Sequence, residues 1–142
     1  MTKKEYFKLI EYKNELLSEL KTTLSLAHLD FSLDETEHVE SWLVKADKLS
    51  QREIDAITVY YGETLIYQVG GKWEYCDDSK QVDYLSPVII DYVGFDGIPL
   101  NPLGLVRTGI RKKKTGLIKS TIEFLLNKPE ILKGTKDRIK KA

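Results

Sequence analysis

The first half of the chain has apolar residues at helical spacing, which predicts amphipathic helices. Residues 3–26 place most of their apolar side chains on one stripe with a 3.6-residue period, with lysine and glutamate elsewhere. A second helix is expected over 33–47. Its start is marked by Ser32 and Glu35, which have the spacing of a capping box. Four residues of this helix should face inward: Val39, Trp42, Leu43 and Ala46.

A third helix is expected from Gln51 to Val69, because Ser50 and Glu53 repeat the capping pattern. Its apolar residues cover most of the circumference, which is typical of a central, buried helix. The main apolar face contains Ile54, Ile57, Tyr61, Leu65 and Val69. A second apolar strip on the far side contains Ala56, Tyr60 and Tyr67. The pair Gly70-Gly71 should end the helix, because glycine adopts left-handed backbone conformations without a steric penalty.

After the glycine pair the pattern changes from helical to alternating. Residues 72–76, KWEYC, alternate like a short strand, and residues 77–83 form a polar loop. Residues 87–93, PVIIDYV, are the strongest strand, because they are rich in β-branched side chains and begin with a proline at a permitted position. The turn sequence Asp96-Gly97 predicts that residues 98–100 fold back as a third short strand.

Two more helices are expected at the C-terminal end. Asn101-Pro102 should start a short helix that ends near Lys112, and a last helix should extend from Thr115 to Leu126. Residues 128–142 form a basic tail with a frayed end. The chain is therefore predicted to form a single α+β domain over residues 1–142. N-terminal helices precede a small antiparallel sheet of two to three strands, and C-terminal helices follow it.

Length and composition are those of one globular domain. The chain has 142 residues, of which 42% are hydrophobic and 31% are charged, enough to bury a core beneath a well-solvated surface. No apolar run approaches the roughly 18 residues that span a bilayer. The N-terminus lacks the apolar core of a signal peptide, and the single cysteine, Cys76, cannot form an intramolecular disulfide. We therefore expect a cytoplasmic protein.

The net charge of zero conceals a division along the chain. Residues 27–91 contain 14 acids and 5 bases, whereas residues 107–142 contain 12 bases and 3 acids. The asymmetry is compatible with a basic segment that binds nucleic acid, with an acidic docking face, or with two segments that neutralise each other. The basic run Arg111–Lys114, with Lys119, is interpreted as a solvated helix end, because no known nucleic-acid-binding module accompanies it.

The chain contains no sequence motif for nucleotide, metal or covalent chemistry. Gly70-Gly71 follows a helix and lacks the spacing of a phosphate-binding loop. Asp34 and His38 are four residues apart on one helix face, but we interpret them as a surface charge pair because no zinc motif accompanies them. We therefore expect no cofactor, no metal ion and no catalytic residue.

Glu63 is the acid with the most unusual surroundings. It follows Tyr60 by three residues and precedes Tyr67 by four, beside the second apolar strip. A carboxylate partly buried among aromatic rings is desolvated, which raises its pKa unless a cation or a hydrogen-bond donor compensates. We expect a structural partner, either Arg107 or a backbone N–H group. The alternative is a small-ligand-binding module or an enzyme centred on Glu63.

Several single residues form a pattern that resembles small uncharacterised bacterial proteins similar to immunity proteins of polymorphic-toxin and contact-dependent competition systems. In that pattern a helix contains Gly-Glu, a glycine and a tryptophan follow, and Asn-Pro precedes a later helix. The matching residues of this chain are Gly62, Glu63, Gly71, Trp73, Asn101 and Pro102. The resemblance extends over about residues 29–126.

The resemblance implies a binding protein, not an enzyme, that neutralises a cognate toxin domain by direct contact. Many toxin domains are basic nucleases, and an acidic surface would mask such a site and speed the encounter. We therefore predict that the partner-binding residues are the acids Asp34, Glu35, Glu37, Asp77 and Asp78. Neither a membrane nor a nucleic-acid partner is expected. The remaining alternative is a nucleic-acid-binding accessory protein that uses the basic C-terminal segment.

Overall fold

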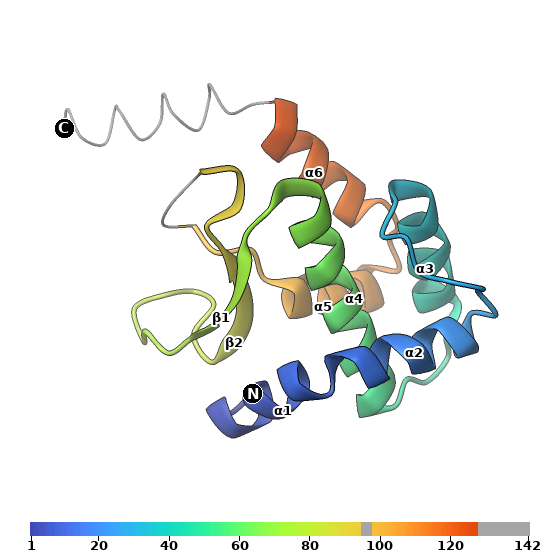
Figure 1. The fold of residues 1–142 in the computed structure, drawn as a ribbon, viewed down its shortest axis with the longest axis horizontal. Helices are drawn as coiled ribbons and strands as arrows, with labels where there is room; N and C mark the ends of the chain where they lie inside the picture. Colours follow the sequence, from blue (N-terminus) through green and yellow to red (C-terminus); the bar gives the residue numbers. More distant parts are fainter. Residues whose placement is uncertain (95–97, 128–142) are drawn as a thin grey trace.

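The computed structural model describes residues 1–94 and 98–127. Helices at both ends of the chain surround a central helix, and a small sheet packs at one side (Figure 1). The elements in order are α1 (Lys3–Glu11), α2 (Lys13–Thr23), α3 (Leu33–Lys45), α4 (Gln51–Val69), β1 (Lys72–Cys76), β2 (Ser86–Ile90), the short 3-10 helix η1 (Tyr92–Gly94), α5 (Pro102–Lys112) and α6 (Leu117–Asn127). This arrangement confirms the predicted α+β fold. The predicted tail, residues 128–142, lies outside the described residues.

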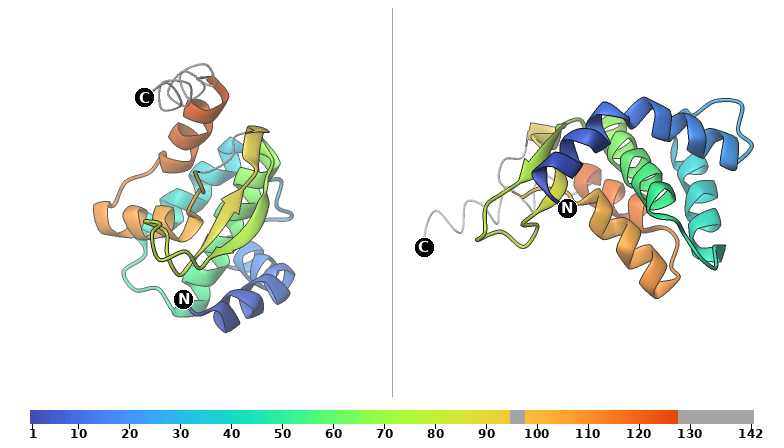
Figure 2. Two further views of the ribbon diagram at one scale, coloured as in Figure 1. Left: turned by 90° about the vertical axis from the view of Figure 1, so that its left-hand side faces the viewer. Right: turned by 90° about the horizontal axis from the view of Figure 1, so that it is seen from below.

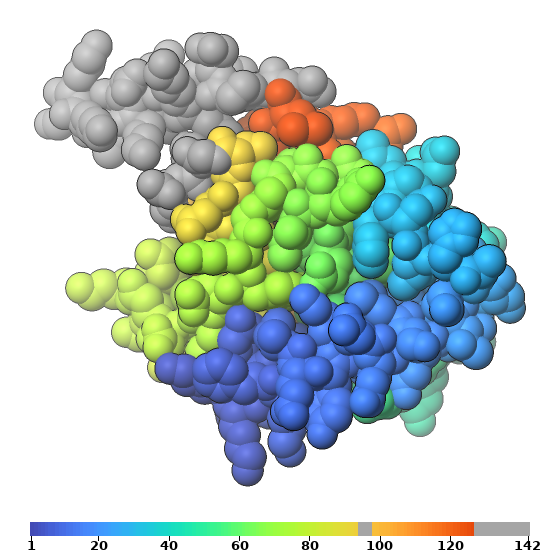
Figure 3. Space-filling model, viewed as in Figure 1, coloured from blue at the N-terminus to red at the C-terminus, as the bar shows by residue number. Residues whose placement is uncertain are grey.

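The central helix is α4, as its apolar circumference predicts. Among its residues Ile57, Val59 and Leu65 are fully buried, and the helix contacts all the other described helices (Figure 2). Ser50 begins it with the predicted capping box, and Gly70 ends it at a φ of 78°. The prediction that Tyr67 belongs to a second apolar strip of a buried helix is wrong, because this side chain is 69% exposed. Figure 3 shows the reason: the C-terminal end of α4 reaches the surface between α3 and the sheet.

The predicted helix over residues 3–26 is divided into two. The break falls at Tyr12, whose backbone leaves helical geometry at a φ of −94° and a ψ of 13°. The two helices on either side of the break pack in different places: α2 lies along α4, whereas α1 leans toward the sheet. The ring of Tyr6 stacks on that of Tyr75 in β1, with centroids 5.4 Å apart. The Tyr75 hydroxyl also donates a 2.6 Å hydrogen bond to the Met1 carbonyl.

In the described part of the chain the sheet has two antiparallel strands, β1 and β2. Glu74 in β1 faces Val88 in β2, and this register places Lys72 opposite Ile90. The predicted strand over 87–93 ends at Ile90, because the chain then turns through positive φ at Asp91 (59°) and enters η1. The predicted third strand is reduced to a single bridge between Ile89 and Leu100. The predicted Asp96-Gly97 turn lies outside the described residues.

The two C-terminal helices close the core from the other side. Helix α5 packs against α3, α4 and β2, and α6 packs against α3, α4 and α5. Helix α6 begins at Leu117, two residues later than predicted, because Gly116 before it has a φ of 84°. None of the helices described is both long and apolar enough to cross a bilayer.

Candidate functional site

Glu63 lies on α4 where α2 and β1 meet the central helix. Its Oε1 forms a 2.6 Å ion pair with Lys13 Nζ and accepts a 3.2 Å hydrogen bond from Trp73 Nε1. The ion-paired side chains are largely shielded, with 29% of Lys13 and 20% of Glu63 exposed. The carboxylate is therefore paired within the chain, as a buried charge normally is. Neither Arg107 nor a backbone N–H group, the partners predicted from the sequence, is the one found.

The glycines of the same motif make room for neighbouring parts of the fold. The Trp73 ring occupies the space that a side chain at Gly62 would need. At Gly71, where φ is 104°, a Cβ atom would lie only 2.6 Å from the Ile90 carbonyl oxygen. The backbone can approach β2 this closely only without a side chain. Gly62, Glu63, Gly71 and Trp73 thus form one structural unit that fixes β1 on α4.

Asn101 and Pro102 have an equally clear structural role. Asn101 Oδ1 accepts a 2.9 Å hydrogen bond from the Gly104 N–H and so caps α5, and Pro102 occupies the first turn, where its missing N–H has no cost. Asn101 Nδ2 also donates to Asp83 Oδ1 at 3.0 Å. This second bond ties the β1–β2 connection to the start of α5.

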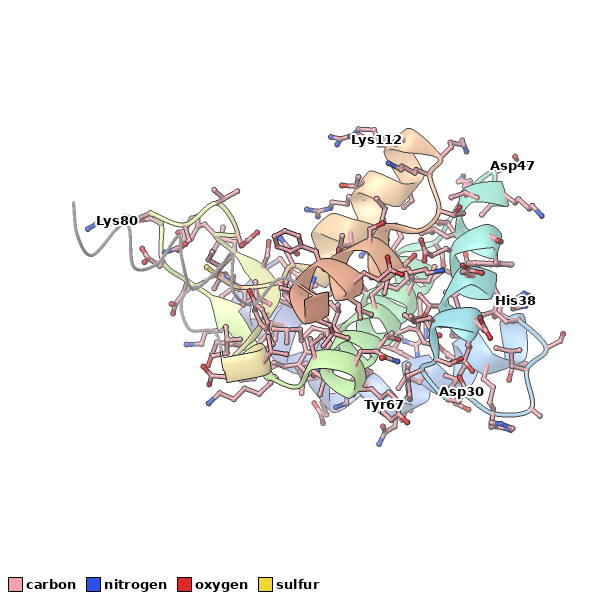
Figure 4. The ribbon with its side chains drawn as sticks, turned by 90° about the horizontal axis from the view of Figure 1, so that it is seen from above. Asp30, His38, Asp47, Tyr67, Lys80 and Lys112 are labelled. Carbon is pink, nitrogen blue, oxygen red and sulfur yellow. The ribbon has the colours of Figure 1, made fainter. Side chains whose placement is uncertain are left out.

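The five predicted partner-binding acids are not brought together. Asp34 and Glu37 are exposed on the first half of α3. Asp77 and Asp78 are exposed in the β1–β2 connection, at the far end of the molecule (Figure 4, where His38 marks α3 and Lys80 marks the connection). A compact partner would cover one of these two ends.

Glu35 is not available to a partner, because its carboxylate is used inside the fold. Its two oxygens accept backbone N–H bonds from Asp30 at 2.8 Å and from Phe31 at 3.0 Å, and Oε1 also accepts the Tyr60 hydroxyl at 2.9 Å. Burial, together with the neighbouring Glu35 charge, raises the pKa of Tyr60, so this hydroxyl remains a donor. Glu35 therefore holds the loop before α3 against α4.

Sequence reasoning missed Glu40, the most deeply buried acid of the part described. Only 2% of it is exposed, and its Oε2 accepts a 3.1 Å hydrogen bond from the Leu117 N–H at the start of α6. Its Oε1 accepts no hydrogen bond from the residues described. Burial raises the pKa of Glu40, and the N–H groups of Gly116 and Leu117 offset part of that rise. The carboxyl group thus links α3 to α6.

Neither the surface grooves nor the arrangement of possible metal-ligating side chains in the described part of the chain supports a ligand site at Glu63. Four grooves have volumes of 290, 370, 210 and 300 Å³, and Glu63 lines none of these four. Asp34 and His38 are both exposed on α3. Within residues 1–94 and 98–127 no three His, Cys, Asp or Glu side chains are arranged to hold a metal ion.

Tyr67 gives the α3 end of the molecule an aromatic group. Its ring lies 6.5 Å from that of Phe31, measured between centroids, and Gln68 Nε2 donates to the Phe31 carbonyl at 3.1 Å. The exposed Asp30 is in the same loop, and hydrogen bonds from Ser32 lower its pKa and keep it charged. We call Asp30, Asp34, Glu37 and Tyr67 the acidic end (Figure 4, where Asp30 and Tyr67 are labelled).

Comparisons with protein-family models, with curated proteins and with solved structures find no match to this chain.

Proposed function

We propose that this chain is an immunity-type binding protein, which neutralises a basic bacterial toxin domain by contact through the acidic end. The observation on which the proposal rests is the arrangement of that surface. Asp34 and Glu37 project from a helix whose position is fixed by the core, and the exposed Tyr67 ring lies near Phe31 in the loop before that helix. Tyrosine is enriched at the centres of protein interfaces, because it offers a large rigid surface and a polar hydroxyl.

Charge complementarity favours a basic partner. Of the two exposed α3 acids, Glu37 has a distant ion pair, with 4.0 Å between its Oε1 and Lys119 Nζ. Exposed pairs of this kind contribute little to stability, so Glu37 can exchange Lys119 for a cation of a partner at small cost. An acidic surface of this kind accelerates encounter with a basic protein and sets the orientation of docking.

The contacts of the motif residues within the fold support a binding role over a catalytic one. Glu63 is neutralised by Lys13 and oriented by Trp73, while Asn101 caps a helix. These residues stabilise the fold, which then presents the acidic end. Under this proposal the protein acts in the cytoplasm, where a toxin delivered from a neighbouring cell would otherwise reach its target.

Binding to the toxin domain encoded directly upstream of this gene tests the proposal. The probe is the purified C-terminal domain of that toxin, and the dissociation constant is measured by calorimetry at two salt concentrations. The double reversal Asp34→Lys with Glu37→Lys should weaken binding by about 10-fold or more, because it places cations against a basic surface. Co-expression of the wild-type chain should also protect cells from the toxin.

The matched control reverses two exposed acids at the other end of the molecule. Asp77→Lys with Asp78→Lys changes the net charge by the same amount and should leave the dissociation constant within about 2-fold. If this control weakens binding as much as the α3 variant, the acidic end is not the interface. If the upstream domain is not a toxin, or shows no binding to the wild-type chain, the immunity proposal is wrong.

A further inference from the structure

The second charged surface of the molecule is basic and lies at the C-terminal end of α5. Arg107, Arg111, Lys112, Lys113 and Lys114 are all exposed there, and we call them the α5 basic cluster. Figure 4 shows Lys112 at the edge of the molecule, beside the C-terminal end of α3 and away from Asp30 and Tyr67. We propose that this cluster binds the phosphate backbone of double-stranded nucleic acid without reading its sequence. This proposal does not depend on the toxin-binding one.

The cluster is not neutralised by the described part of the chain. The ion pairs found among residues 1–94 and 98–127 use Lys13, Arg52, Lys72 and Lys119 as cations. Among the described residues, the interpretation that the acidic and basic segments cancel each other therefore holds only for Lys119 and Glu37, at 4.0 Å. Five cations remain within eight consecutive residues, and their repulsion favours an anionic partner.

Stabilisation of the helix end explains only part of the cluster. Arg111 and Lys112 lie in the last turn of α5, where a cation interacts favourably with the helix dipole. Lys113 ends the helix at a φ of 51°, and Lys114 lies beyond it. These two lysines extend the positive charge around the end of the helix. Arg107 lies in the middle of α5, outside the last turn in which the dipole effect operates.

The spacing of the cations suits a repeating anion. Arg107 and Arg111 are four residues apart on one helix face, which separates them by about 6 Å along the helix axis. Successive cations spaced in this way can each approach a different phosphate of one backbone. Arginine suits this role further, because its planar guanidinium group binds phosphate oxygens in a bidentate manner.

The composition of the surrounding surface favours a nucleic acid over a membrane or an acidic protein. No large hydrophobic side chain is exposed between residues 99 and 123. A membrane-bound helix needs an apolar face to insert, and a protein interface needs a buried apolar or aromatic anchor. A phosphate backbone needs neither, because contact with it is dominated by charge.

The same stretch favours a duplex over a single strand. Residues 99–123 contain no aromatic residue, whereas proteins that bind single strands stack bases on aromatic rings. Backbone contacts to a duplex require only cations at the surface. The expected affinity is that of non-specific binding, with a dissociation constant of about 10⁻⁴ to 10⁻⁶ M at physiological salt.

Fluorescence anisotropy with a labelled duplex of arbitrary sequence tests the proposal. Wild-type affinity should fall steeply with salt, with a log–log slope of about −3 to −4 if four phosphates are contacted. The variant with Arg107→Gln, Arg111→Gln and Lys114→Gln should bind about 10-fold more weakly or worse, with a slope closer to −1. All three side chains are exposed, so circular dichroism should show an unchanged fold.

The control variant removes three exposed cations from α1 by Lys3→Gln, Lys4→Gln and Lys8→Gln, and it should bind the duplex within about 2-fold of wild type. An equal loss in this control would mean that net charge alone drives binding, and the assignment to α5 would fail. The proposal would also fail if polyglutamate competes as well as unlabelled duplex, if anionic lipid vesicles bind the chain more tightly than the duplex does, or if a single strand of equal length binds better.

Discussion

The indole ring of Trp73 lies over the backbone of Gly62, and the contact leaves no space for a side chain between them. The same indole donates its N–H to Glu63, the next residue of α4. A glycine in the middle of a helix costs about 1 kcal/mol relative to alanine. Here the cost is offset by the close approach of strand and helix, which positions β1 and the loop that follows it.

Gly62→Ala should destabilise the protein in spite of the better helix propensity of alanine. The added methyl group overlaps the Trp73 ring, and overpacking of this kind costs about 1–3 kcal/mol. Chemical denaturation measures the loss. In the background of Trp73→Ala the same substitution should be neutral or stabilising. An equal loss in both backgrounds would show that Trp73 is not the obstacle.

The Lys13–Glu63 ion pair should contribute more to stability than an exposed pair. Lys13→Met leaves a partly buried carboxylate with Trp73 alone and should cost about 1 kcal/mol. The comparison is Arg52→Met, which removes the exposed pair with Glu19, with side chains 56% and 50% exposed, and should destabilise the protein less than Lys13→Met does. Urea unfolding at neutral pH gives both values. Equal losses of unfolding free energy in the two variants would show that shielding from solvent does not strengthen the Lys13–Glu63 pair.

Glu40 should make the stability of the protein fall as the pH rises. Burial raises its pKa in the folded state above the usual value of 4.5, so the folded state holds this proton more tightly than the unfolded state does. The associated stability is fully present below the unfolded pKa and is lost as the pH rises through the folded pKa. Glu40→Gln removes the charge and should be more stable than wild type at pH 7, by roughly 1 kcal/mol.

Unfolding free energies of the Glu40→Gln variant and the wild type, measured between about pH 4 and pH 8, should converge toward the acidic end of that range. The control is Asp34→Asn, which removes an exposed acid from the same helix and should leave the contribution of Glu40 to stability unchanged. If the difference in unfolding free energy between Glu40→Gln and the wild type stays constant with pH, the protonation of the buried carboxyl group is not linked to folding.

Asn101 should be the most sensitive position of the Asn-Pro motif. Asn101→Ala removes the cap of α5 and the bond to Asp83, which should cost about 1–2 kcal/mol. Asn101→Ser retains a capping oxygen and should recover about half of the loss. Asp83→Ala loses only the second bond, so it should be the mildest of the three. If Asp83→Ala is as damaging as Asn101→Ala, the cap is not the main contribution.

Elements with local start and stop signals could be predicted from the sequence. Helix α4 begins after Ser50 and ends at Gly70 as predicted, because a capping box and a glycine act within a few residues. The break between α1 and α2 has no such signal. Tyr12 is neither glycine nor proline, and the break serves the stacking of Tyr6 on Tyr75, a contact between distant parts of the chain.

The hydrogen-bond partner of Glu40 and the ion-pair partner of Glu63 were also harder to predict, because these partners come from distant parts of the chain. Glu40 shares an inward stripe with Thr36 and Leu43, so its position was visible in the helical period. Its hydrogen-bond donor is 77 residues away at the start of α6. Likewise, charge alone suggested Arg107 as the partner of Glu63, whereas the packing of α2 against α4 supplies Lys13.

The stacking of Tyr6 on Tyr75 also bears on how the chain assembles during synthesis. The two rings lie 5.4 Å apart, yet the ribosome makes Tyr6 long before Tyr75. A contact between such distant residues is expected to form late, because a long loop must close first. The nascent chain should therefore leave the Tyr6 ring of α1 without its partner until β1 has emerged, and during that interval chaperones could bind this segment.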